Sequence, residues 1–354
     1  MTTRLYEVVA LVLGAYARAR FRVRTVGAPF RPPPGALVVS SHRSDDDVPL
    51  IIATLYRPLH GRWRRNARLH FAVRDDLFLP GFFAGYPPHV PRLVRRAVFP
   101  LNVGPVLRTL LPCHPIRSAT KMRLYEYLRE HPDERLDVLL PPRLAAPFDG
   151  MTYARDVLNG DFAPQLWTAI EPDDVAGPHA DASWARRRAG AREDFRDLVE
   201  VVGSGEPLCI FPEGRPSPDG ALGPVLGGVD AIVRRAKPSV VVPIAPAYDP
   251  LVDGRTHAFI GVGEPVAPPV DVLELLRRTT PLTVGESVAA AIADGVDPYA
   301  RLDDDVAAAR ESGRPYEPEL DDAGVRDVRV ETALRHARGR DLARLVLGYR
   351  SARA

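Results

Sequence analysis

Short apolar runs that alternate with longer helical patterns are the strongest constraint on the fold of this chain. The runs are rich in β-branched residues and bounded by glycine, proline or charged residues, as buried strands are. The expected strands cover 36–40, 69–74, 208–211, 240–248 and 258–262, and the expected helices cover 5–22, 192–202, 228–236 and 269–278. This alternation predicts an α/β fold with a single central, mostly parallel or mixed sheet flanked by helices.

The domain limits are expected where this alternation starts and stops. Residues 1–30 are interpreted as an N-terminal amphipathic helix, residues 31–265 as the main α/β domain and residues 266–354 as a helical C-terminal extension. Residues 141–190 are rich in proline, aspartate, glycine and alanine and have weak periodicity. A loop of that length is expected to be an insertion or a lid.

Composition narrows the classes of protein to which the chain can belong. Of its 354 residues, 45% are hydrophobic and 26% are charged, which is typical of a globular protein, and a net charge of +2 does not indicate a nucleic-acid partner. Cys113 and Cys209 lack metal-site spacing and cannot make a disulfide scaffold, so a cytoplasmic location is expected. The uncharged run 8–17 falls short of the ~20 residues that a bilayer-spanning helix needs.

One histidine and three consecutive aspartates directly follow the expected strand 36–40. Ser44 is a good N-cap for a helix over 45–56, so His42 leaves the end of the strand and Asp47 lies in the first helical turn. A carboxylate placed there can accept the Nδ1–H of the ring, fix its tautomer and leave Nε2 free to take a proton. His42 and Asp47 are therefore candidate catalytic residues, and a purely structural role is the alternative of equal weight.

The other two aspartates have a simpler interpretation. Asp45 and Asp46 are expected to be first-turn residues that the helix dipole stabilises. A divalent metal site built from His42 and the three aspartates is a further alternative, since hard cations favour clustered carboxylates. Consecutive residues on a helix do not share a face, however, and the expectation is that no metal is bound.

A second polar segment follows another buried strand. Glu213, Gly214 and Arg215 come directly after the strand 208–211 and the proline at 212. In open α/β sheets, ligands bind at the carboxyl ends of strands. The segment therefore predicts a polar site at that edge of the sheet.

Four sequence blocks, in this order, resemble the glycerophospholipid acyltransferase superfamily, which includes glycerol-3-phosphate and 1-acylglycerol-3-phosphate acyltransferases. The blocks are H-x-x-x-x-D at 42–47, HPIR at 114–117, FPEG at 211–214 and VPI at 242–244, and the segment FAVRDDLF at 71–78 also matches. The resemblance covers residues 5–265 apart from the insertion. It departs in the third block, where Arg215 stands one place earlier than the arginine of the family.

The resemblance implies a glycerol-3-phosphate acyltransferase-like fold and an O-acyltransferase activity in lipid metabolism. His42 would be the general base on the acceptor hydroxyl, and Asp47 would orient it. Acyl-CoA or acyl carrier protein would donate the acyl group to glycerol phosphate, lysophosphatidic acid or a related lipid acceptor, without a metal or organic cofactor. The substrate-binding residues that it implies are Arg43, Ser44, Arg117, Glu213, Gly214 and Arg215, with Arg117 near the acceptor phosphate. The alternative is a catalytically weak lipid-binding homologue of the same fold.

Residues 77–125 contain no acidic side chain. Their cations are Arg92, Arg95, Arg96, Arg108, Arg117, Lys121 and Arg123, and their aromatic residues include Phe78, Phe82, Phe83, Tyr86 and Phe99. Such a segment suits an anionic membrane surface, and its prolines exclude a spanning helix. We therefore expect a peripheral protein at the inner face of the cell membrane. The alternative is a buried apolar stretch with solvated arginines.

Overall fold

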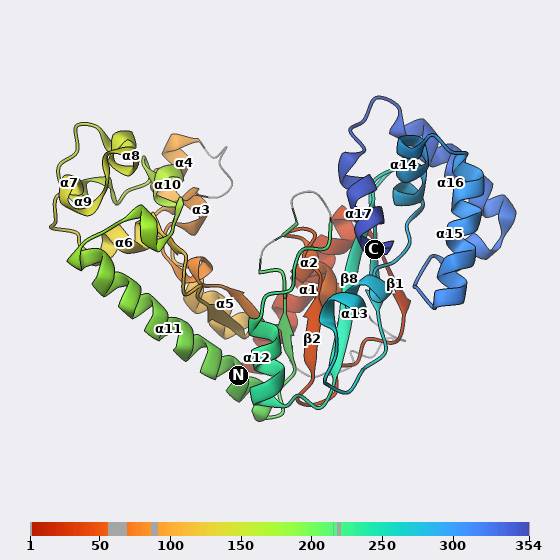
Figure 1. Cartoon of the computed structure of the whole chain (residues 1–354), viewed down its shortest axis with the longest axis horizontal. Helices are drawn as coiled ribbons and strands as arrows, with labels where there is room; N and C mark the ends of the chain where they lie inside the picture. The colour runs from red at the N-terminus through yellow and green to blue at the C-terminus, as the bar shows by residue number, and fades with distance from the viewer. Residues whose placement is uncertain (1, 56–68, 86–90, 215, 218–220, 354) are drawn as a thin grey trace. The chain divides into compact units, whose positions relative to one another are not determined.

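The computed structural model describes residues 2–55, 69–85, 91–214, 216–217 and 221–353 (Figure 1). The chain forms two compact units, of which the first joins residues 1–71 to residues 199–354 and the second contains residues 72–198. This division differs from the expected one, in which residues 31–265 formed one domain and residues 1–30 and 266–354 lay outside it. The reason is that the N-terminal and C-terminal helices both pack with the sheet strands of the first unit.

A mixed sheet forms the core of the fold. Within the described residues its strand order is β1-β9-β8-β2-β7-β3-β4. The strands are β1 (Arg22–Gly27), β2 (Leu37–Ser40), β3 (His70–Arg74), β4 (Cys113–Ile116), β7 (Leu208–Ile210), β8 (Val241–Asp249) and β9 (His257–Val262). Strands β8, β2, β7 and β3 run parallel, β9 is antiparallel to β8, and β1 is parallel to β9. The α/β class is therefore confirmed, and the five expected strands lie within one residue of their positions.

Helices cover both faces of this sheet. Every residue of β2, β7 and β9 is buried, which requires apolar cover on each side. The helices of the first unit are α1 (Thr2–Arg20), α2 (Asp47–Leu55), α12 (Gly228–Ala236), α13 (Val272–Thr279), α14 (Val284–Asp294), α15 (Pro298–Ser312), η4 (Pro318–Asp321), α16 (Ala323–Ala337) and α17 (Ala343–Arg353). α1 packs on α2 and β1, while α13 packs on β8 and β2.

The C-terminal helices belong to the sheet unit and do not form a separate extension. Helix α14 contacts β8 and also packs against α15, α16 and α17. The apolar core of these helices includes Leu251, from the segment after β8, together with Val288, Leu302 and Tyr349. Because this core is continuous with the end of β8, the boundary expected at residue 266 is absent.

Helix α1 has a buried face and an exposed face, and the exposed face carries apolar side chains as well. It buries Tyr6, Ala10 and Ala17, whereas Val8 and Val12 are exposed. Among the residues described, none of the helices combines the length and the apolar character that crossing a bilayer requires.

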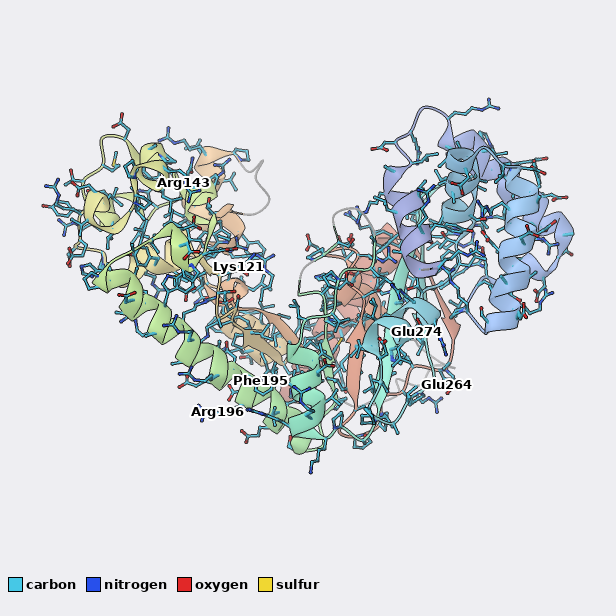
Figure 2. All side chains as sticks on the ribbon, in the orientation of Figure 1. Lys121, Arg143, Phe195, Arg196, Glu264 and Glu274 are labelled. Atoms are coloured by element: carbon cyan, nitrogen blue, oxygen red, sulfur yellow. The ribbon has the colours of Figure 1, made fainter. Side chains whose placement is uncertain are left out.

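The second unit is a set of short helices packed beside one long helix, α11 (Pro178–Gly203), which carries Phe195 and Arg196 (Figure 2). Besides β4 of the sheet, its other elements are η1 (Asp75–Phe78), α3 (Phe82–Gly85), α4 (Arg92–Val98), α5 (Gly104–Leu110), β5 (Met122–Arg123), α6 (Leu124–Glu130), α7 (Leu136–Leu139), α8 (Pro142–Ala145), η2 (Ala146–Phe148), α9 (Ala154–Val157), α10 (Ala163–Leu166), β6 (Ala169–Ile170) and η3 (Pro172–Asp174). The buried Arg187 of α11 donates to the Glu126 carboxylate at 2.8 Å and also pairs with Asp75.

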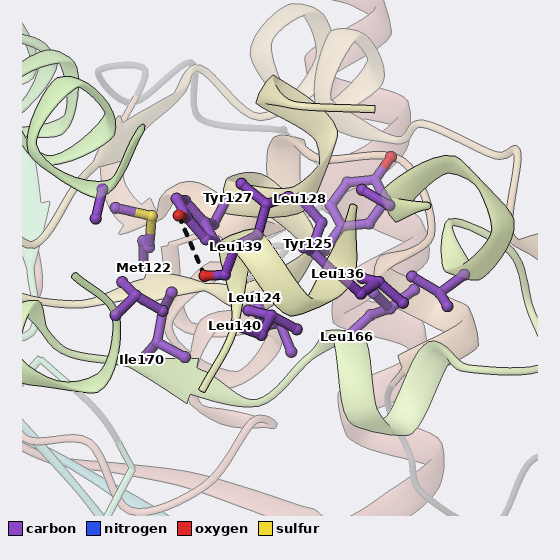
Figure 3. Close-up of a cluster of buried hydrophobic side chains, with 14 of the residues drawn as sticks. Met122, Leu124, Tyr125, Tyr127, Leu128, Leu136, Leu139, Leu140, Leu166 and Ile170 are labelled. Atoms are coloured by element: carbon purple, nitrogen blue, oxygen red, sulfur yellow. Dashed lines mark hydrogen bonds between the residues drawn. The ribbon is translucent and has the colours of Figure 1, made fainter. Parts of the chain in front are cut away.

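Residues 141–190 form part of the apolar core of this unit. Phe148, Leu166 and Trp184 are buried in the cluster that includes Tyr127, whose hydroxyl donates to the Leu139 carbonyl at 3.4 Å (Figure 3). Residues 141–190 are therefore helical and packed, not the loop that was expected, and they belong to a unit that is inserted in the sequence between the two segments of the first. Helices of about one turn leave too few residues for a 3.6-residue apolar period to appear in the sequence.

Protonation of His257 is expected to destabilise the fold. Burial, followed by the charges of Arg329, Arg22 and Arg24, lowers the pKa of His257 from 6.5 to about 4. Because the unfolded chain binds this proton more tightly, the free energy of unfolding falls as the pH drops from 6.5 towards 4. In urea titrations across this range, His257→Phe should remove about 1–3 kcal/mol of that loss. An identical pH dependence in both proteins would contradict this assignment.

Candidate functional site

The parallel pairing of β2 with β7 brings His42 and Glu213 together. Val39 pairs with Ile210, so His42 and Glu213 each come three residues after this pair, at the same edge of the sheet. The Glu213 Oε1 atom accepts the backbone N–H of His42 at 2.9 Å. The two segments singled out in the sequence therefore form one site at the carboxyl ends of neighbouring strands, where open α/β sheets bind ligands.

The Asp47 carboxylate is the centre of this site. Its Oδ2 accepts the ring Nδ1–H of His42 at 2.9 Å, the backbone N–H of Arg43 at 2.7 Å and that of Ser44 at 2.9 Å. Its Oδ1 accepts the hydroxyl of Tyr248 at 2.6 Å. The predicted contact between His42 and Asp47 is thus confirmed. With four donors on a fully buried group, this carboxylate acts only as an acceptor, as an ionised carboxylate does.

The His42 ring is held on one edge and one face. Asp47 takes the Nδ1–H, and the Phe211 ring stacks on the imidazole with 4.3 Å between ring centroids. Nε2 has no hydrogen-bond partner among the described residues, and 16% of the side chain is exposed. A neutral imidazole protonated on Nδ1 and open at Nε2 can accept a proton from a hydroxyl group.

Tyr248 is a site residue that the sequence analysis missed. It lies at the carboxyl end of β8, the other parallel neighbour of β2, and its side chain reaches Asp47 from there. Burial raises the pKa of the Tyr248 phenol, and the Asp47 charge raises it further, so the hydroxyl stays a donor. Its position could have indicated this role, because it is a polar aromatic residue at the end of an apolar strand.

Glu213 and Gly214 shape the backbone of the site. Besides holding His42, Glu213 accepts the backbone N–H of Gly223 at 2.8 Å through Oε2, so both oxygens bind the protein itself. Gly214 has φ +69°, and a Cβ at this position would approach the Leu226 side chain to 2.7 Å, so the turn requires glycine. Arg215 lies outside the described residues.

Arg43 points into the protein interior. Its side chain is 4% exposed, and its Nε and Nη2 atoms have no hydrogen-bond partner among the described residues. The positive charge of Arg43 acts on Glu286 of α14. Burial raises the pKa of the Glu286 carboxyl group, and the Arg43 charge opposes this rise. Ser44, expected to bind substrate and to cap a helix over 45–56, accepts the backbone N–H of Asp46 on Oγ at 3.2 Å, in the turn before α2, which begins only at Asp47.

The three aspartates point to different partners. Asp47 binds His42, whereas Asp46 accepts the Tyr16 hydroxyl at 2.8 Å and pairs with Arg20 at 3.2 Å. Asp45 is exposed. Across the part of the chain that the structure describes, no group of three or more histidine, cysteine, aspartate or glutamate side chains is arranged to hold a metal ion.

Arg117 belongs to the second unit, whereas His42 belongs to the first. Its guanidinium forms a two-pronged pair with Asp194, through Nε at 2.8 Å and Nη2 at 2.9 Å, and its backbone N–H binds the same carboxylate. The Asp194 hydrogen bond raises the pKa of Arg117. The guanidinium fork expected to hold a phosphate therefore binds a protein carboxylate in this structure.

Acidic residues from outside 77–125 neutralise most of the cations in that segment. The pairs are Arg92 and Arg96 with Asp161, Arg117 with Asp194, Lys121 with Glu171 and Arg123 with Asp76. Phe82 and Phe99 pack against the core, while Phe83 is 47% exposed and Tyr86 lies outside the described residues. The net positive charge of the segment is therefore smaller than the sequence implied, and its aromatic side chains divide between the core and the surface.

No protein-family model, curated protein or solved structure matches this chain. The resemblance to glycerophospholipid acyltransferases accordingly rests on the ordered blocks of the sequence.

Loss of the Tyr248 hydroxyl should destabilise the protein more than loss of an exposed one. Tyr248→Phe leaves a buried Asp47 oxygen without its donor, which should cost about 1–3 kcal/mol of unfolding free energy in urea titrations. The matched control is Tyr16→Phe, whose hydroxyl binds Asp46 at the exposed surface, with an expected effect below about 0.5 kcal/mol. If both variants lost the same unfolding free energy, the buried hydrogen bond would contribute no more to stability than the exposed one.

Proposed function

We propose that this protein is an O-acyltransferase. It would move an acyl group from acyl-CoA or acyl carrier protein to a hydroxyl of glycerol phosphate, lysophosphatidic acid or a related lipid. The observation that carries the proposal is the Nδ1–H of His42 bound to Asp47 at 2.9 Å, with Nε2 left open beside the segment that carries Glu213. The order of the four sequence blocks supports the choice of acyl transfer over other reactions that need a base.

The proposed reaction begins with the acceptor hydroxyl. Nε2 of His42 takes the hydroxyl proton as the oxygen attacks the thioester carbonyl carbon, and the resulting imidazolium is stabilised by the Asp47 carboxylate. The tetrahedral intermediate then collapses, the C–S bond breaks, and the leaving thiolate takes the proton back from His42. The products are an ester and a free thiol, and the proposed reaction needs no metal or organic cofactor.

One observation favours the alternative of a catalytically weak lipid-binding protein. Glu213 and Arg117, both expected to bind the acceptor, have their charged groups occupied by protein partners. A protein of this kind would bind lipid without releasing thiol from an acyl donor. Variants of His42 separate the two functions.

Substitution of the base should abolish turnover. With a radiolabelled acyl-CoA and a panel of lysolipid and glycerol phosphate acceptors, His42→Ala should lower kcat by about 10²–10⁴-fold, and Asp47→Asn should also lower it. The matched control is His336→Ala, which removes a second histidine–aspartate pair of the same unit, the one with Asp253 at 2.8 Å. If thiol release by His42→Ala equals that of the wild type, the proposed function is wrong.

We also propose that helices α3–α5 contact an anionic membrane surface. The exposed apolar residues of these helices are Phe83, Leu93, Val94 and Val106, Leu101 between α4 and α5 is also exposed, and α4 buries none of its residues. Arg92 and Arg96 share the single carboxylate of Asp161, so these three side chains together carry one net positive charge. Apolar side chains that enter the interface next to basic residues are the pattern by which peripheral proteins bind anionic lipid.

A double variant of α4 tests the membrane contact. Leu93 and Val94 are 77% and 47% exposed, so replacing both by glutamate should not disturb folding but should weaken sedimentation with vesicles rich in phosphatidylglycerol about tenfold or more. The control is Val138→Glu on α7 of the same unit, which is 57% exposed. The proposal would be contradicted if the wild-type protein did not sediment with such vesicles at low salt.

A further inference from the structure

The last helix of the chain, α17, contacts both loops that build the site. Arg344, Gly348 and Ser351 are spaced four and three residues apart and therefore share one face of the helix. Arg344 reaches the loop that carries His42, and Ser351 reaches the loop that follows Gly214. These contacts join residues 301 and 129 positions apart in the sequence.

The first contact acts on the peptide group between Arg43 and Ser44. The N–H of that group, from Ser44, donates to Asp47 Oδ2 at 2.9 Å, and its carbonyl, from Arg43, accepts from Arg344 Nη2 at 2.6 Å. This peptide plane, the second after His42, is thus held from both sides. Since the preceding N–H, that of Arg43, also binds Asp47, rotation of this plane would move the carboxylate that orients the ring.

The second contact acts on the loop held by Glu213. The Leu222 backbone N–H donates to Ser351 Oγ at 3.0 Å, and the next N–H, from Gly223, donates to Glu213. The other oxygen of Glu213 accepts from His42. The hydrogen bonds therefore form a closed ring that runs from α17 through the His42 turn and Glu213 to the second loop and returns to α17.

Helix α17 is itself anchored firmly. Tyr349 and Arg353 both donate to Oδ1 of the buried Asp305, at 2.7 and 2.6 Å, and Ser287 of α14 donates to Oδ2 at 2.7 Å. Val346 and Tyr349 are buried. A helix fixed in this way can hold the two loops that it touches.

We propose that Arg344 and Ser351 are positioning residues, which hold the His42 turn and the Glu213 loop in the arrangement that the base requires. Neither residue needs to touch substrate. The loop arrangement follows from the hydrogen bonds alone, whereas its effect on turnover rests on the proposed acyl transfer. We expect a substitution here to change the rate of the reaction and to leave substrate affinity unchanged.

Hydrogen exchange tests the positioning without any assay of activity. In full-length protein with Arg344→Gln and Ser351→Ala, amides of peptides covering 42–47 and 221–226 should exchange about tenfold faster than in the wild type. The control is Arg350→Gln on the same helix, whose partner is Asp294 and not a loop of the site. Unchanged exchange in the double variant, in folded protein by circular dichroism, would overturn the proposal.

Steady-state kinetics then test the consequence for turnover. The double variant should lose about 3- to 30-fold in kcat, with KM for both substrates within about twofold, and Arg344→Lys should recover part of the loss because it keeps a charged donor. A raised KM with normal kcat would overturn the positioning role. If the wild type transfers no acyl group but exchange in the double variant is faster, the proposed function fails and the loop assignment stands.

Discussion

The buried carboxylate of Asp47 is the interaction on which the site depends. A charge that lies in the protein interior is costly unless hydrogen bonds replace its hydration. Here the replacement comes from the His42 ring, two consecutive backbone N–H groups and Tyr248. The turn after β2, the first residue of α2 and the end of β8 must all be in register for these donors to converge. The geometry of the base is therefore a consequence of how the charge is satisfied.

The same unit supplies every contact of this arrangement that the structure describes. Parallel pairing of β2 with β7 places Glu213 within hydrogen-bond distance of the His42 backbone N–H. Pairing of β2 with β8 places the Tyr248 hydroxyl within hydrogen-bond distance of Asp47. From the opposite end of the chain, α17 adds Arg344 to the same turn. Elements from three distant parts of the sequence thus fix one imidazole. This is the preorganisation that general-base catalysis needs.

Local sequence patterns predicted the strands and the pairing of His42 with Asp47, because both depend on residues close in the chain. They did not identify Tyr248 or Arg344, whose partners lie 201 and 301 positions away. Except for the helix expected over 192–202, which lies in α11, they also missed the second unit, because its helices of a single turn hide the apolar period. The expected phosphate ligand Arg117 illustrates the same limit, since nothing near it in sequence indicated Asp194 as its partner.

The most direct test of this account is the protonation pattern of one ring. Nuclear magnetic resonance of protein labelled with ¹⁵N-histidine, with His42→Gln used for assignment, reports which nitrogen of His42 carries the proton. We expect the proton on Nδ1, with a strongly deshielded Nδ1–H signal that is lost in Asp47→Asn. A neutral ring protonated on Nε2, or a signal indifferent to Asp47, would contradict it.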